Sequence, residues 1–222
     1  MIRIHFNSLN WHQFNANVPF SELTFPYQNS EIEQLEHQFH LLIKQRILGL
    51  PIDKLLSTYP RLAHWLKQLE QAAPEFFTEP CNQYIEFDTS LQRVMGEVLL
   101  EVNCDALVYR YNSLEIVNWT AYPLQSEEEL RHNWPTGLSL FLAATTSTYF
   151  VDEITITYWF VTDSSEPVKV SFNYNPDEHE QFKTQLEEAI KQLKIPLNPT
   201  PTPNTNPSLI KDYLDTITEV EL

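Results

Sequence analysis

Apolar residues in the first third of the chain recur every three to four positions, the spacing of amphipathic helices. One stripe begins after a capping box at Ser30–Glu33 and ends at Gly49, so a helix is predicted between them. Two shorter helices are predicted over residues 51–59 and 60–73. The first helix should bury Ile32, Leu35, Phe39, Leu42, Ile43 and Ile47.

From Tyr84 onward apolar and polar residues alternate, which is typical of half-buried strands. Strands are predicted over residues 84–87, 94–109 and 114–120, with a tight turn before the last of them. Residues 1–29 are rich in aromatic side chains, and we expect them to be irregular apart from one short helix near Trp11.

The rest of the chain alternates between helix and strand. A capping box at Ser126–Glu129 opens a helix in which Pro135 should cause a kink or a restart. Strands over residues 153–161 and 168–174 follow, and Pro176 begins a last amphipathic helix.

This order predicts an α/β fold (α+β mixed) over residues 1–195, with a central mixed sheet flanked by helices and an N-terminal helical segment. Residues 196–208 contain five prolines and no aromatic residue, so we expect an extended linker. Residues 209–222 should form a short amphipathic helix, whose stripe consists of Leu209, Ile210, Tyr213, Leu214, Ile217 and Val220. Three alternatives stay open for this segment: it folds back onto its own domain, it is a docking peptide for another protein, or it is disordered.

Composition narrows the function classes. Thirty acidic residues against fourteen Lys and Arg give a net charge of −16 in 222 residues. Phosphate contacts need cations, and the sequence has no basic stripe, so nucleic acid is disfavoured as a partner. The chain has no apolar run of membrane-spanning length and no secretory signal pattern, so we expect a cytoplasmic protein with no membrane partner. Two cysteines are too few for a disulfide framework or a thiolate metal cage.

Candidate chemistry lies on two neighbouring predicted strands. Glu101 and Asp105 share one face of the first strand, while Asn118 and Thr120 share one face of the second. If the faces correspond, these side chains converge. A metal-dependent phosphodiesterase needs two carboxylates for Mg²⁺ and a Lys, whereas this chain offers an amide and a hydroxyl at two of those places. From the spacing alone, an ordinary polar patch at a sheet end is the simpler interpretation.

The chain resembles the RecB-like branch of the PD-(D/E)XK nucleases from about residue 1 to about residue 195. Four stretches carry the resemblance, in the family's order. They are His40 with the segment that follows it to Ile52, Asp105 followed by Ile116–Pro123 (IVNWTAYP), Asn133–Trp134 with Leu138 and Phe141, and Ile154–Val161 (ITITYWFV).

The resemblance implies a PD-(D/E)XK nuclease-like core, with His40 as the upstream metal-facing residue and Asp105 as the first metal carboxylate. Glu101 would lie close by. Asn118 stands where the family has its second acid, and Thr120 stands where it has Lys. Glu36 replaces a usual Gly. Other departures are Pro135, Gly137 and Ser139 in the places of a Gln, an Arg and a Tyr, and the absence of the cysteines that hold an iron–sulfur cluster in some relatives.

These departures predict a non-catalytic member of the superfamily, a pseudonuclease, which acts as an interaction or regulatory protein. We expect no cofactor and a protein partner, bound through the C-terminal helix (Leu209, Ile210, Tyr213, Leu214, Ile217). The alternative is a metal-dependent DNA nuclease in DNA repair or processing, with a residual or migrated active site. That alternative would require Mg²⁺, held by Asp105 with His40 and Glu101.

Overall fold

The computed structural model describes residues 2–6, 31–78, 83–124, 126–163 and 166–192. Met1–Gln192 forms one compact unit. The predicted linker, the predicted C-terminal helix and the short helix near Trp11 lie outside the described residues. The domain boundaries given above therefore stay predictions.

The three helices predicted between residues 30 and 73 are present. They are α1 (Glu31–Ile47), α2 (Asp53–Thr58) and α3 (Pro60–Ala72), followed by the 3₁₀ turn η3 (Pro74–Phe76). Gly49 ends α1 with φ +71°, and the N–H of Leu50 donates to the carbonyl of Gln45 at 3.0 Å. This Schellman arrangement satisfies carbonyls at the helix end. The core under these helices includes Phe39, Leu42 and Ile43 of α1 and Leu62, Trp65, Leu66 and Leu69 of α3.

Within the described residues, six strands form one mixed sheet. They are β1 (Ile2–Phe6), β2 (Tyr84–Met95), β3 (Val98–Arg110), β4 (Ser113–Thr120), β5 (Ile154–Phe160) and β6 (Val168–Asn173). The order is β1-β3-β4-β5-β6, and β2 pairs with β3 along its other edge. The β1–β3 and β4–β5 pairs are parallel, and the remaining pairs are antiparallel.

Two strand predictions are wrong. The predicted strand 94–109 is two strands, because Gly96 (φ +62°) turns the chain between β2 and β3. Glycine adopts this left-handed conformation without a steric penalty, which permits the turn. Residues 2–6 were expected to be irregular, but they form β1, paired in parallel with Val98–Val102.

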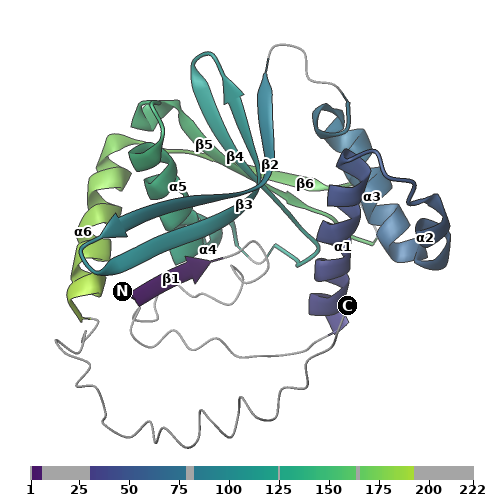
Figure 1. Cartoon of the computed structure of the whole chain (residues 1–222), viewed down its shortest axis with the longest axis horizontal. Helices are drawn as coiled ribbons and strands as arrows, with labels where there is room; N and C mark the ends of the chain where they lie inside the picture. Colours follow the sequence, from purple (N-terminus) through teal and green to yellow (C-terminus); the bar gives the residue numbers. More distant parts are fainter. Residues whose placement is uncertain (1, 7–30, 79–82, 125, 164–165, 193–222) are drawn as a thin grey trace, which may run out of the picture. The chain divides into compact units, whose positions relative to one another are not determined.

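Helices cover both faces of the sheet (Figure 1). The core under α1 and α3 includes Val117 and Trp119 of β4. On the other side lie α4 (Glu127–His132), α5 (Trp134–Thr146) and α6 (Pro176–Gln192), with the short turn η4 (Val151–Glu153) before β5. Asn133 separates α4 from α5, so the restart predicted at Pro135 is confirmed. The predicted fold class, an α/β domain with a central mixed sheet flanked by helices, is also confirmed.

Among the described residues, no helix has the length and apolar character needed to cross a membrane.

Candidate functional site

The hydrogen-bonded strand pairing is interrupted on both edges of β3 at Asp105. On one edge of β3, β1 pairs with Val98–Val102 and β4 pairs with Ala106–Arg110, so residues 103–105 have no strand partner there. On the other edge the β2–β3 ladder runs through Phe87 and Thr89 but omits Asp88, which stands opposite Asp105. Asp88 has φ +51°, a left-handed conformation that Asp tolerates better than most residues.

Side chains replace the missing ladder hydrogen bonds between β3 and β4. The N–H of Asp105 donates to the Asn118 Oδ1 atom at 3.3 Å. In return, the N–H of Trp119 donates to the Asp105 Oδ2 atom at 2.9 Å. Asp105, which the nuclease resemblance makes the first metal-binding carboxylate, is therefore held between β3 and β4 by hydrogen bonds that involve the backbone of both strands.

The carboxyl group of Asp105 also points toward α1. Its Oδ1 atom lies 2.8 Å from the His40 Nδ1 atom. The other ring nitrogen of His40, Nε2, lies 3.4 Å from the Oε1 atom of Glu36, one turn earlier on α1. The second oxygen of Glu36 accepts the N–H of Ala121 at 2.6 Å. We name these three side chains the Glu36–His40–Asp105 cluster.

The cluster is almost closed to solvent. The exposed fractions of its side chains are 1% for Glu36, 14% for His40 and 9% for Asp105. Burial alone lowers the pKa of His40. The charge and hydrogen bond of Asp105, and then those of Glu36, outweigh burial and raise this pKa to about 10. The ring therefore carries a positive charge at neutral pH, between two carboxylates.

Asn118 and Thr120 lie on the opposite face of β4 from Trp119, which belongs to the core under α1. Both are buried. The Thr120 hydroxyl oxygen accepts the N–H of Tyr122 at 3.1 Å. Asn118 is hydrogen-bonded to Asp105 as described, and it stands beside Tyr158 of β5 in the β4–β5 pair. The structure thus brings Asn118 into contact with Asp105. The hydroxyl of Thr120 instead binds the backbone of Tyr122, two residues further along the chain.

Two further residues of β3 near Asp105, Glu101 and Cys104, are also buried. Glu101 is buried, and its Oε1 atom accepts a hydrogen bond from Gln92 of β2 at 2.6 Å. Cys104 is a buried free thiol. Burial, with a smaller effect from the Asp105 charge, raises the pKa of this thiol far above its usual value, which disfavours the thiolate form.

These residues do not fit the Mg²⁺ ion that the nuclease resemblance implies. A magnesium site needs several oxygen atoms free to face one point. Both oxygens of Asp105 and both oxygens of Glu36 already have hydrogen-bonding partners within the protein. In the part of the chain that the structure describes, no group of three or more His, Cys, Asp or Glu residues is arranged to hold a metal ion.

A groove of about 420 Å³ lies beside the cluster, between α1 and strands β2 and β3. His40 and Asp105 line this groove. Lys44 of α1 and Asp88 of β2, which also line it, form an ion pair with each other. Leu41 and Leu48 on its α1 side are 48% and 65% exposed. The remaining lining residues are His37, Ile47, Phe87, Asn103, Cys104 and Trp119.

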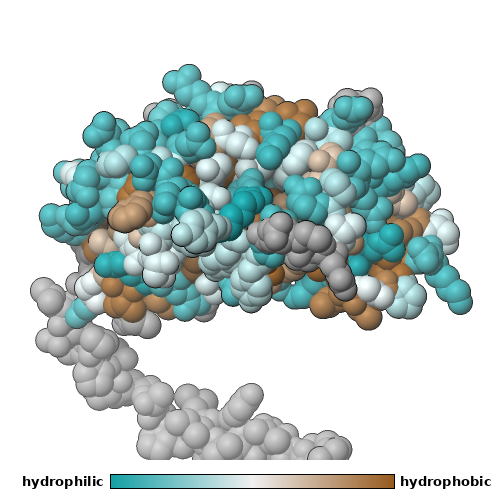
Figure 2. Space-filling model, turned by 90° about the horizontal axis from the view of Figure 1, so that it is seen from above, coloured by the Kyte–Doolittle hydropathy of each residue, from teal (hydrophilic) through white to brown (hydrophobic). Residues whose placement is uncertain are grey.

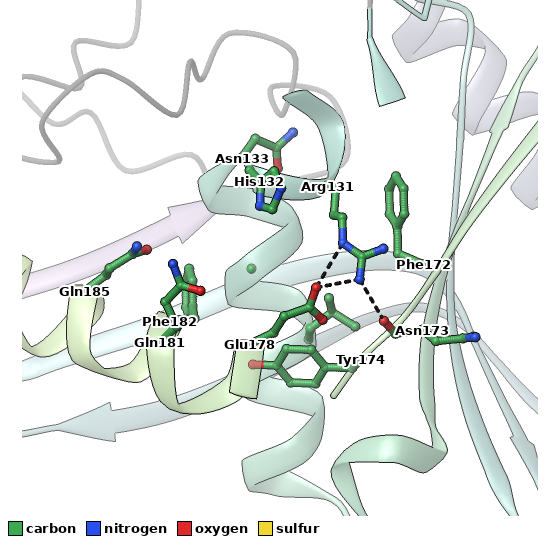
Figure 3. Close-up of a pocket in the computed structure, with 12 residues that line it drawn as sticks. Arg131, His132, Asn133, Phe172, Asn173, Tyr174, Glu178, Gln181, Phe182 and Gln185 are labelled. Carbon is green, nitrogen blue, oxygen red and sulfur yellow. Dashed lines mark hydrogen bonds and ion pairs between the residues drawn. The ribbon is translucent and has the colours of Figure 1, made fainter. Parts of the chain in front are cut away.

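A second pocket, of about 280 Å³, lies among α4, α5, β6 and α6 (Figure 3). Its guanidinium group, from Arg131, is ion-paired with Glu178 and lies over the ring of Phe172 at 5.4 Å. Because Glu178 neutralises this charge, the pocket offers no free guanidinium for a phosphate.

Helix α5 packs into the core. It carries Pro135, Gly137 and Ser139 where the resemblance predicts a Gln, an Arg and a Tyr. Pro135 and Ser139 are buried, and the Ser139 hydroxyl donates to the Pro135 carbonyl at 2.7 Å. A Cβ atom on Gly137 would lie 2.3 Å from the Phe182 ring, so α6 can approach α5 closely only because this residue is glycine. These three positions therefore have packing roles.

Sequence reasoning missed the part that Glu36 plays. It treated this residue only as the replacement of a Gly, whereas Glu36 is buried between His40 and the backbone of Ala121. One signal was available: Glu36 stands one helical turn before His40, on a helix whose neighbouring positions Leu35 and Phe39 are apolar.

No protein-family model and no curated protein matches the chain. Among solved structures, the chain is similar to a "Putative exonuclease" from Eubacterium rectale, with 6% identity, a TM-score of 0.48, and coverage of 84% of this chain and 80% of that one. It is also similar to an alkaline exonuclease from Laribacter hongkongensis, with 8% identity, a TM-score of 0.40, and coverage of 95% and 91%. The predicted likeness to exonuclease structures is thus found, at identities and TM-scores that identify neither a family nor a reaction.

Proposed function

We propose that this chain is a non-catalytic protein on a nuclease-like fold, which acts by binding another protein. One observation carries the proposal: each oxygen of Asp105 already accepts a hydrogen bond within the protein, from His40 and from the N–H of Trp119. A metal ion would have to share these oxygens with the two hydrogen-bond donors or displace them. Asn118 and Thr120 supply neither the second charge nor the cation that the hydrolysis of a phosphodiester requires.

The charges of the molecule support a protein partner over nucleic acid. The net charge is −16. Several described cations are paired with acids, among them Lys44, Arg46, Arg61, Arg110 and Arg131. A strand of nucleic acid would have to displace such pairs to gain its phosphate contacts.

The groove beside α1 is the surface that we propose for the partner. Leu41, Leu48 and the nearby Leu50 are exposed large apolar residues, and apolar side chains around a groove are typical anchors for a partner segment. The face drawn in Figure 2 is mainly hydrophilic, with hydrophobic residues gathered in separate patches. The C-terminal segment, including Leu209, Ile210, Tyr213, Leu214 and Ile217, is a second proposed contact with a partner.

The alternative function is a metal-dependent DNA nuclease. The 2.8 Å contact between His40 and Asp105 favours it, because both residues resemble the metal-facing residues of that family. A nuclease assay separates the two functions. The wild-type chain, incubated with Mg²⁺ or Mn²⁺ and with single- or double-stranded DNA, should leave the DNA intact. Cleavage that the Asp105→Ala variant abolishes would overturn the proposal.

The double variant Asn118→Asp, Thr120→Lys belongs in the same assay. It restores the acid and the Lys at their places in the motif, so cleavage by this variant alone would show that the two substitutions removed the activity. Circular dichroism must first show that this variant folds, since Thr120 is fully buried.

The binding surface needs its own test. The variant Leu41→Asp, Leu48→Asp places charge on the groove, and Tyr111→Asp, in the β3–β4 turn and 97% exposed, is the matched control. A partner captured by the wild-type chain should be lost with the groove variant and kept with the control. Capture that is equal for all three chains would exclude the groove as the binding surface.

A further inference from the structure

The imidazole ring of His40 stands between two carboxylates that come from different parts of the fold. Asp105 belongs to β3, and Glu36 belongs to α1. The second oxygen of each carboxylate accepts a backbone N–H, from Trp119 in β4 and from Ala121 just beyond it. The cluster therefore joins the first helix to two central strands at the point where those strands separate.

Both ring nitrogens of His40 face a carboxylate oxygen, Nδ1 that of Asp105 at 2.8 Å and Nε2 that of Glu36 at 3.4 Å. When both carboxylates are ionised they only accept hydrogen bonds, and each ring nitrogen then has to carry a hydrogen for both contacts to form. A ring with two N–H groups is an imidazolium cation. One cation between two buried carboxylates that are also bound to backbone N–H groups resembles the charge arrangement around a metal ion with two carboxylate ligands.

We infer that the His40 ring takes the place of a metal ion in this chain, so that the cluster joins α1 to the sheet without any metal. The inference rests on the proposed function, because both require an Asp105 carboxylate that binds no ion. It goes further in assigning the neutralising role to a side chain. It also has a direct consequence: without the ring, Glu36 and Asp105 would face a cavity as two buried charges, and a hard divalent cation could occupy it.

The test compares four forms of the full chain: wild type, His40→Ala, His40→Ala with Asp105→Asn, and the control His37→Ala. His37 is exposed and lies on the same helix. Thermal unfolding is followed in EDTA and at increasing concentrations of Mg²⁺, Ca²⁺ or Mn²⁺. Wild type and His37→Ala should unfold at the same temperature in every buffer. The His40→Ala chain should unfold earlier in EDTA and later when an ion is added.

The size of the metal effect follows from linkage. An ion at ten times its dissociation constant, bound only by the folded chain, lowers the unfolding equilibrium constant about elevenfold. The His40→Ala, Asp105→Asn chain should lose this response, since it lacks one of the two carboxylates. A His40→Ala chain that does not respond to any ion would overturn the inference, and so would a wild-type chain that responds as strongly as the variant.

A spectroscopic measurement on the wild-type chain covers the case in which His40→Ala does not fold. Nitrogen-15 NMR of the His40 ring at neutral pH should show a hydrogen on both ring nitrogens, and addition of Mg²⁺ should leave these signals unchanged. One bare ring nitrogen would overturn the inference. The nuclease assay is a separate readout: cleavage by the wild type would overturn the proposed function, whereas a missing metal response of His40→Ala would overturn only the role given to the ring.

Discussion

The carboxylate of Glu36 accepts the backbone N–H of Ala121 at 2.6 Å, across 85 positions of sequence. This hydrogen bond fixes the middle of α1 to the chain segment that leaves β4. Glu36 is fully buried, so the contact is protected from solvent and is strengthened by the negative charge of the acceptor. The N-terminal helices are therefore attached to the sheet by a polar contact as well as by their apolar core.

Replacing Glu36 with Ala should destabilise the fold strongly. The change removes one partner of His40 and leaves the N–H of Ala121 without its acceptor, and breaking a buried ion pair on one side typically costs about 3–5 kcal/mol. The free energy of unfolding from urea titrations measures the effect. Glu31→Gln, at an exposed position in the first turn of α1, is the control and should change it by less than about 0.5 kcal/mol. Equal effects of the two variants would contradict the role of Glu36.

Stability should fall as the pH rises above neutral. Burial lowers the pKa of His40, but Asp105 and Glu36 raise it from 6.5 to about 10 in the folded chain. Because the folded value is the higher one, the cluster stabilises the fold fully below pH 6.5 and loses this contribution as the pH approaches 10. Urea titrations at several pH values should show this loss in the wild type.

The variant His40→Gln provides the control for the pH effect. It cannot bind a proton in this range, so its unfolding free energy should change less with pH than that of the wild type. Tyr109 does not interfere, because burial and its hydrogen bond to Glu86 raise its pKa to about 12. Parallel pH profiles of the wild type and His40→Gln would refute the assignment of the effect to His40.

The hydroxyl of Thr120 should matter more than its methyl group. Thr120→Val keeps the shape but removes the acceptor of the Tyr122 N–H, which costs about 1–3 kcal/mol at a buried position. Thr120→Ser keeps the hydroxyl and should destabilise the fold less. Thermal unfolding of both variants measures the difference, and a Val variant as stable as the wild type would contradict a structural role of the hydroxyl.

Gly137→Ala should loosen the contact between α5 and α6. The new Cβ atom would lie 2.3 Å from the Phe182 ring, which must move, and overpacking of this kind costs about 1–3 kcal/mol. Phe182→Ala removes the clash, so the double variant should be more stable than the sum of the single changes indicates. Additive effects in this double-mutant cycle, measured by urea unfolding, would show that the two side chains do not meet.

The helices and most strands could be predicted because their periodicity is local. Phe39, Leu42 and Ile43 are buried as the 3.6-residue spacing predicts, and Asn175 caps α6 through the N–H of Glu178. The turn at Gly96 was missed because the alternation of β2 continues into β3, although glycine within a strand pattern is a turn signal. The strict alternation of Ile2–Phe6 was also available as a strand signal.

The site was predictable only in part. The resemblance brought His40 and Asp105 into one site, and the structure places their atoms 2.8 Å apart. The environment of Glu36 could not be predicted from its helix, since a Glu on a helix is usually solvated. Its burial depends on the backbone of Ala121, which is far away in sequence. Likewise, only the strand register shows that Asp105 lies where both neighbouring ladders are interrupted.

The parallel pairing of β1 with β3 has a consequence for biosynthesis. Ile2 pairs with Val98, so the ribosome releases the first strand roughly a hundred residues before its partner is complete. During that interval the edge of β1 is open to other chains, because an unpaired strand can join a foreign sheet. Translation rate and chaperone capture of the unpaired β1 segment should therefore influence how much folded protein a cell obtains.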